Sequence, residues 1–301
     1  MRYGILTCMK KNRKILLLLS IVLVVSLALF FSKDYILRYT SPRTPPLFSL
    51  TVETVSQFSL TGESLSQKIV RSGGKWFVEK DGRQFAADSE KMITLIQTLN
   101  GLSPETIVSK NKNKHAELGI GTEIIVVKTS GRERTLYLGK PYRSNARYAR
   151  LDDDEAVFVG ENLQSIPLNS DYRDLKTHLL DDESALQSLE IDMNGVKTKL
   201  VKNKDEWTLG DKKLKNSPIN YYLSDLKNLT ATDIIGADIK IMETNPSLTL
   251  HLRTQKQEKT ADFIKYDEKS YVMKSPSYPW LFIIPEVNVA SLQKQKKDFL
   301  E

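Results

Sequence analysis

The chain has 301 residues, 27% of them charged and 40% hydrophobic, and its formal net charge is +7. Five of those positive charges lie in residues 1–14, and the remainder shows no basic stripe interleaved with aromatic residues, so we expect no nucleic acid partner. The single cysteine, Cys8, precedes the first apolar segment, which excludes disulfides, thiolate metal sites and a cysteine nucleophile from residues 32–301.

Residues 15–31 form the first predicted element, a run of seventeen positions without a charged residue, a glycine or a proline. As a helix this run is about 26 Å long, close to the thickness of a bilayer core. The positive-inside rule keeps the basic tail 1–14 in the cytoplasm and places residues 32–301 outside it. We therefore expect a single transmembrane helix in the cell membrane. The alternative is a signal peptide that is cleaved after Ala28, which would leave three large apolar residues at the new N-terminus.

Residues 32–47 read as a linker, because three of the six residues from Ser41 to Pro46 are prolines. Such a sequence favours an extended, semi-rigid spacer. Beyond it, short alternating apolar runs are separated by glycine, asparagine and aspartate turns and interrupted by two amphipathic helices. This pattern predicts an α+β fold.

Two parts of the chain repeat the same order of elements. Each has a hairpin whose second strand carries a tryptophan, Trp76 in the first part and Trp207 in the second. An amphipathic helix follows in each, over residues 89–102 and 217–229. A short closing helix ends each repeat.

One face of each helix is apolar, and we expect both faces to be buried against the sheet of their own unit. Asp88 or Ser89 is the expected N-cap of the first helix, and Ser217, followed by Pro218 in the first turn, is that of the second. The apolar stripes are Met92, Leu95, Ile96, Leu99 and Leu102 in the first helix, and Ile219, Tyr222, Leu223, Leu226 and Leu229 in the second.

The repeat continues through the strands that follow, with offsets between 123 and 127 residues, after an offset of 131 for the two tryptophans. Ile107 is matched with Ile234 at an offset of 127. Offsets that change only between elements are typical of a duplicated unit with loop deletions. The sequence therefore predicts two tandem units, residues 48–180 and 181–301, each an antiparallel sheet with one main packed helix.

Three features carry a resemblance to a known family: the hairpin at residues 73–76 ahead of a helix start at 87–89, the run at 118–120, and the segment from 171–174 to 179–180. Together they resemble the bacterial DUF4340 family, a domain of unknown function. Its members look like membrane-anchored envelope proteins, often encoded beside ABC-type export permeases and gliding-motility-type auxiliary proteins. The resemblance implies an accessory role and names no catalytic residue. The chain departs from the family at residues 121–122, where Asp or Pro is usual.

The sequence has no metal-ligand spacing and no Gly-x-Ser-x-Gly elbow, and its Ser-x-x-Lys match at residues 72–75 is predicted to be a hairpin turn. His115, His178 and His251 lie in different predicted elements, and His251 alternates with leucines on what should be the polar face of a strand. The acidic runs 152–155 and 181–183 are predicted to be solvated turns. We expect no cofactor, no metal and no enzymatic activity. A hydrolase is the third hypothesis and would need two carboxylates that converge in a cleft.

The loop at residues 275–280 is the one predicted ligand-binding feature. It carries Tyr278 and Trp280 on a proline-punctuated tip with no counterpart in the first unit. Exposed aromatic side chains stack on sugars or anchor protein partners, whereas the alternative is that Trp280 covers the edge of the sheet. We expect a non-enzymatic envelope protein that binds another envelope protein, such as a component of an ABC-type transporter. The alternative partner is a cell-wall or surface glycan.

Overall fold

The computed structural model describes residues 22–23, 26, 46–204, 206–236 and 244–300. The predicted basic tail, most of the predicted transmembrane segment 15–31 and most of the linker lie outside these residues. Within the described residues, no helix is both long enough and apolar enough to cross a membrane.

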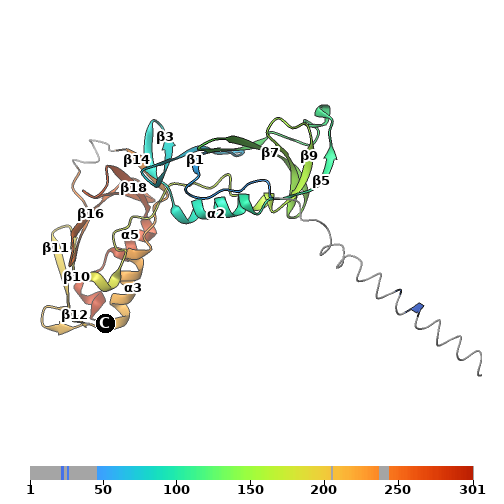
Figure 1. Ribbon diagram of the computed structural model, residues 1–301. Helices are drawn as coiled ribbons and strands as arrows, with labels where there is room; N and C mark the ends of the chain where they lie inside the picture. The colour runs from blue at the N-terminus through green and yellow to red at the C-terminus, as the bar shows by residue number, and fades with distance from the viewer. Residues whose placement is uncertain (1–21, 24–25, 27–45, 205, 237–243, 301) are drawn as a thin grey trace, which may run out of the picture. The chain divides into compact units, whose positions relative to one another are not determined.

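The described strands form two nine-stranded antiparallel sheets (Figure 1). The first sheet contains β1 (Val55–Thr61), β2 (Ser66–Ser72), β3 (Lys75–Lys80), β4 (Arg83–Ala86), β5 (Pro104–Ser109), β6 (Glu123–Thr129), β7 (Glu133–Arg143), β8 (Ala146–Leu151) and β9 (Val157–Glu161). The second contains β10 (Leu186–Met193), β11 (Val196–Asn203), β12 (Glu206–Leu209), β13 (Lys212–Lys213), β14 (Asp233–Gly236), β15 (Leu248–Thr254), β16 (Glu258–Lys265), β17 (Ser270–Lys274) and β18 (Trp280–Pro285).

Both sheets have the same strand order. The first runs β4-β3-β2-β1-β6-β7-β8-β9-β5, and the second runs β13-β12-β11-β10-β15-β16-β17-β18-β14. Every strand of one sheet therefore has a counterpart at the same place in the other. This arrangement is α+β and fits the predicted pattern of two tandem antiparallel units.

Each sheet begins with one strand more than the predicted hairpin. In the first sheet the extra strand is β4, which pairs with β3 through a two-residue turn at Asp81 and Gly82. Both turn residues have positive φ, 51° and 71°, as a type I′ hairpin requires. The Asp-Gly pair is a strong hairpin signal, so this additional strand is predictable from the sequence.

The described helices are α2 (Ser89–Asn100), α3 (Asn216–Lys227) and α5 (Glu286–Leu292), with four short 3₁₀ turns. Asp88 is confirmed as the N-cap of α2, because its Oδ1 accepts from the backbone N–H groups of Glu90 and Lys91. The predicted N-cap at Ser217 is wrong. The helix α3 begins at Asn216, so Pro218 lies within the first turn, where a missing N–H costs nothing. The 3₁₀ turns are Lys112–Lys114, Leu163–Ser165, Glu183–Ala185 and Lys296–Phe299.

The predicted cores are confirmed. All ten side chains of the two apolar stripes are buried, and so are Trp76 and Trp207. Figure 1 shows α2 lying along one face of the first sheet. In the second sheet's unit, the Tyr222 hydroxyl on α3 donates to the backbone carbonyl of Leu292 at 3.0 Å, which ties α3 to the end of α5.

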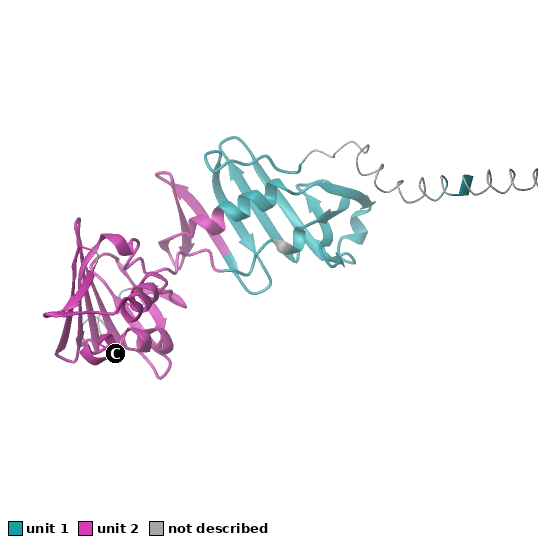
Figure 2. Ribbon diagram, turned by 90° about the horizontal axis from the view of Figure 1, so that it is seen from below, with its two compact units in different colours: residues 1–66, 93–170 teal, residues 67–92, 171–301 magenta. Residues whose placement is uncertain are grey.

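The chain forms two compact units, and their boundaries differ from the boundary between the two sheets (Figure 2). One unit comprises residues 1–66 and 93–170, and the other comprises residues 67–92 and 171–301. The strands β3 and β4 belong to the first sheet by pairing but to the second unit by compactness. The predicted boundary at residue 180 falls between the last strand of the first sheet and the first strand of the second.

Candidate functional site

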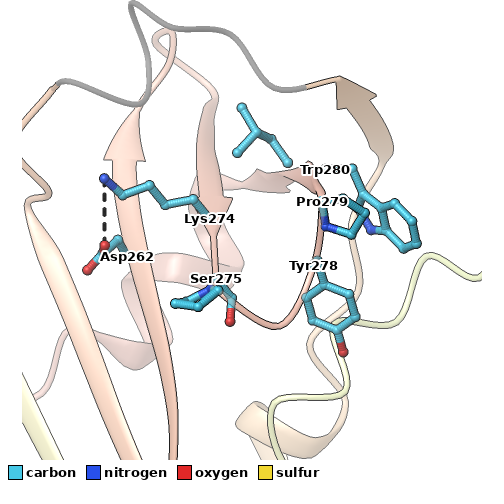
Figure 3. Close-up of a pocket in the computed structure, with 8 residues that line it drawn as sticks. Asp262, Lys274, Ser275, Tyr278, Pro279 and Trp280 are labelled. Carbon is cyan, nitrogen blue, oxygen red and sulfur yellow. Dashed lines mark ion pairs between the residues drawn. The ribbon is translucent and has the colours of Figure 1, made fainter.

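The predicted aromatic loop lines a hollow of 280 Å³ in the second unit. Tyr278 and Trp280 lie on one side of it (Figure 3). Lys274 on β17 and Asp262 on β16 face them and form an ion pair with an N–O distance of 3.7 Å. The structure therefore brings both predicted residues to one hollow that also presents a positive and a negative group.

The two aromatic rings are only partly available to a ligand. Their centroids are 5.9 Å apart with an interplanar angle of 32°. Tyr278 also meets Phe282 edge-on at 5.2 Å, and Trp280 packs on Phe85 at 5.8 Å. Trp280 is the first residue of β18 and pairs with Gly236 of the edge strand β14, so it lies one strand in from the edge.

A hydrogen bond holds the loop at residues 275–280 in place, and one buried donor of the loop has no partner in the described part of the chain. The Tyr278 hydroxyl donates to the backbone carbonyl of Thr177 at 2.9 Å. Burial, reinforced by the negative charges of Asp181 and Asp174, raises the pKa of Tyr278 to about 12, which keeps the hydroxyl a neutral donor. Among the described residues, the indole Nε1 of Trp280 is buried without a hydrogen-bond partner.

His178 forms a second cluster, which the sequence analysis did not predict. It has a positive φ of 46°, and its ring lies between two carboxylates: Nε2 is 2.7 Å from Asp174 and Nδ1 is 2.9 Å from Asp181. Lys259 donates to the backbone carbonyl of His178 at 2.6 Å. Hydrogen bonding to Asp174, joined by Asp181 and opposed by burial, raises the pKa of His178 to about 9. A hollow of 450 Å³ opens beside this cluster, next to Lys91.

The spacing of this cluster was visible in the sequence, because the two aspartates lie four residues before and three residues after the histidine. A helical reading would place all three on one face. The segment is not helical in the structure, and His178, with its positive φ, contacts both carboxylates from an irregular backbone.

Arg173 lies in the segment 171–174, and its contacts are structural. Its guanidinium is buried and binds the carboxylates of Asp171 and Asp233, at 2.5 and 2.6 Å, and the backbone carbonyl of Ile234 at 3.0 Å. The same group lies 5.6 Å from the centroid of the Phe85 ring. Arg173 therefore connects the segment 171–174 to the strand β14 within the second unit.

The acidic runs are turn residues in the structure. Asp152 pairs with Arg134 and accepts from the backbone N–H of Thr135, while Asp182 caps the backbone N–H of Ser184. In the part of the chain that the structure describes, no group of three or more histidine, cysteine, aspartate or glutamate side chains is arranged to hold a metal. His251 is exposed on β15, which confirms its predicted place on a polar strand face.

Two sheet-and-helix modules with one shared strand order define a tandem α+β protein. A family model, described as a domain of unknown function (DUF4340), matches residues 76–249, which is more than half of the chain. The chain belongs to this family. Searches among curated proteins and among solved structures find no significant match.

Proposed function

We propose that this protein is a non-enzymatic envelope protein, anchored by residues 15–31, whose exported units bind another envelope protein such as a transporter component. The basic tail and apolar run support the anchor and the orientation. The binding role rests on the exposed apolar surface of β5, the strand at the edge of the first sheet. On this strand the side chain of Ile107 is 55% exposed and that of Val108 is 42% exposed. An open strand edge with apolar side chains is a surface on which another chain can add a strand.

Co-purification tests this role directly. The full chain, tagged at its C-terminus, is isolated from native membranes in detergent. The control is a shortened chain that ends at residue 47 and carries the same tag. An integral membrane protein enriched only with the full chain supports the role. No enrichment above the short control contradicts it. A C-terminal reporter that is active only in the cytoplasm tests the topology, and activity would contradict the predicted orientation.

The hollow at Tyr278 and Trp280 favours a second candidate, binding of a cell-wall or surface glycan. Aromatic side chains beside a charged pair suit stacking on a sugar and hydrogen bonding of its hydroxyls to Asp262 and Lys274. Retention of the full chain on envelope polysaccharide should fall in Trp280→Ala but not in Tyr266→Ala, which alters an aromatic residue that is 51% exposed elsewhere. Equal retention of both variants removes this site. Release of soluble sugar would instead indicate the third hypothesis, a hydrolase.

A further inference from the structure

The two edge strands β5 and β14 occupy the same place in their sheets, but equivalent side chains on them differ in how far other residues bury them. Ile107 of β5 pairs with Phe158, and Ile234 of β14 pairs with Phe282, so the two isoleucines are equivalent by register. Ile107 is 55% exposed, whereas Ile234 is 4% exposed. A position that is buried in one repeat is therefore open in the other.

The cover over β14 has a definite chemistry. Arg173 donates to the backbone carbonyl of Ile234 and binds the carboxylate of Asp233, both on β14. Phe85 lies against this guanidinium and belongs to the same buried cluster as Ile234. The edge strand β14 is thus covered by the guanidinium of Arg173, which binds one backbone carbonyl and one carboxylate of the strand, and the ring of Phe85 lies beside it.

The surface at β5 offers the complementary features. A hollow of 470 Å³ beside the strand is lined by apolar side chains, including Leu47, Ile107 and Phe158. The charged residues in that lining, Glu105 and Asp154, are both acidic. The hollow therefore combines an apolar floor with two acidic side chains.

Among the described residues, two carboxylates next to β5 share one cation. Glu105 and Glu161 both bind the guanidinium of Arg143, at 3.0 and 2.8 Å. Burial and the neighbouring Glu161 oppose the charge of Glu105 and raise its pKa despite Arg143. A second cation brought to this edge would relieve that repulsion.

The position of the hollow limits which partner reaches it. Leu47, which lines the hollow, follows the predicted anchor by sixteen residues, a span of at most about 55 Å when fully extended. The surface is thus tethered near the membrane.

We propose that the outer edge of β5 binds an extended extracytoplasmic segment of an integral membrane protein, which places an arginine or lysine at Glu105 and an apolar side chain on Ile107. This deepens and rests on the accessory role above. The segment would take the place on β5 that Arg173 and Phe85 take on β14.

A defined peptide tests the chemistry. The probe is a fluorescent peptide of alternating arginine and valine, with a glutamate–valine peptide as its control, titrated against the full chain in a neutral detergent. We expect the arginine peptide to bind, and to bind about tenfold or more weakly to Ile107→Lys and to Glu105→Lys, as for loss of a central contact. The matched control is Val196→Lys on β11, where the valine is 61% exposed, and it should leave binding unchanged.

Each outcome decides the proposal. Equal binding by Ile107→Lys and Val196→Lys overturns it, and so does equal binding of the two peptides. If Ile107→Lys unfolds at a lower temperature than the control, Val108→Lys replaces it at a neighbouring exposed position. Self-association that Ile107→Lys abolishes would also overturn the proposal, because the edge then binds a second copy.

Co-purification separates this inference from the accessory role on which it rests. A membrane protein that is recovered equally with wild type and Ile107→Lys leaves the accessory role standing and refutes the site on β5. Peptide binding that depends on Ile107, without any partner recovered from membranes, refutes the accessory role and keeps the chemistry of the edge.

Discussion

His178 should make the stability of the second unit depend on pH. Both ring nitrogens face carboxylate oxygens, which only accept hydrogen bonds, so both nitrogens must carry a proton. The folded protein accordingly raises the pKa of His178 from 6.5 to about 9. Replacing the side chain in His178→Gln removes the charge while keeping a polar group of similar reach.

The size of the effect follows from that change in pKa. If the group were fully buried, the difference between 6.5 and about 9 would amount to about 3.4 kcal/mol. The His178 side chain is 40% exposed, so screening by water reduces the expected contribution to about 1–2 kcal/mol. Because the folded pKa is the higher one, the contribution is fully present below pH 6.5 and is lost as the pH rises through about 9.

Urea unfolding of the full chain in detergent, followed by tryptophan fluorescence, measures the effect. We expect wild type to exceed His178→Gln by about 1–2 kcal/mol near pH 6 and the gap to close near pH 10. The control is His115→Gln, where the ring meets one backbone carbonyl and no carboxylate. A gap that stays constant with pH, or one of equal size in the control, would refute the reasoning.

Three further predictions concern stability and use the same unfolding assay. Leu99→Ala should lower the free energy of unfolding by about 2–5 kcal/mol, because the Leu99 side chain is fully buried. The control, Ile93→Ala on the same helix, should cost under about 1 kcal/mol, because Ile93 is 47% exposed. Equal costs would mean that α2 packs differently. Arg173→Met should cost about 2–4 kcal/mol, since the buried guanidinium that bridges Asp171 and Asp233 is lost and Asp233 retains the longer contact of 3.8 Å to Lys80. A neutral result would contradict this bridging role. Gly82→Ala should cost about 1 kcal/mol through its φ of +71° alone, whereas Gly131→Ala, which also meets open space but lies outside the positive-φ region, should be close to neutral.

The amino-acid sequence by itself determined the local elements and their repetition. The apolar stripes at helical spacing located α2 and α3, and every side chain of both stripes is buried. Matched offsets between the halves anticipated one strand order shared by both sheets. These features are readable because the periods of helices and strands are local properties, and each buried face must be apolar wherever it packs.

Only the tertiary structure decided which distant groups meet. Arg173 binds Asp233, sixty residues away, and Tyr278 bonds to Thr177 across 101 residues. Hydrophobic periodicity does not encode such partners, because a burial pattern says that a side chain is covered and not by what. The same limit hid the contrast between Ile107 and Ile234, which are equivalent in sequence. Their exposure differs because Arg173 and Phe85 pack at Ile234, and those two residues come from segments that are distant from β14 in the sequence.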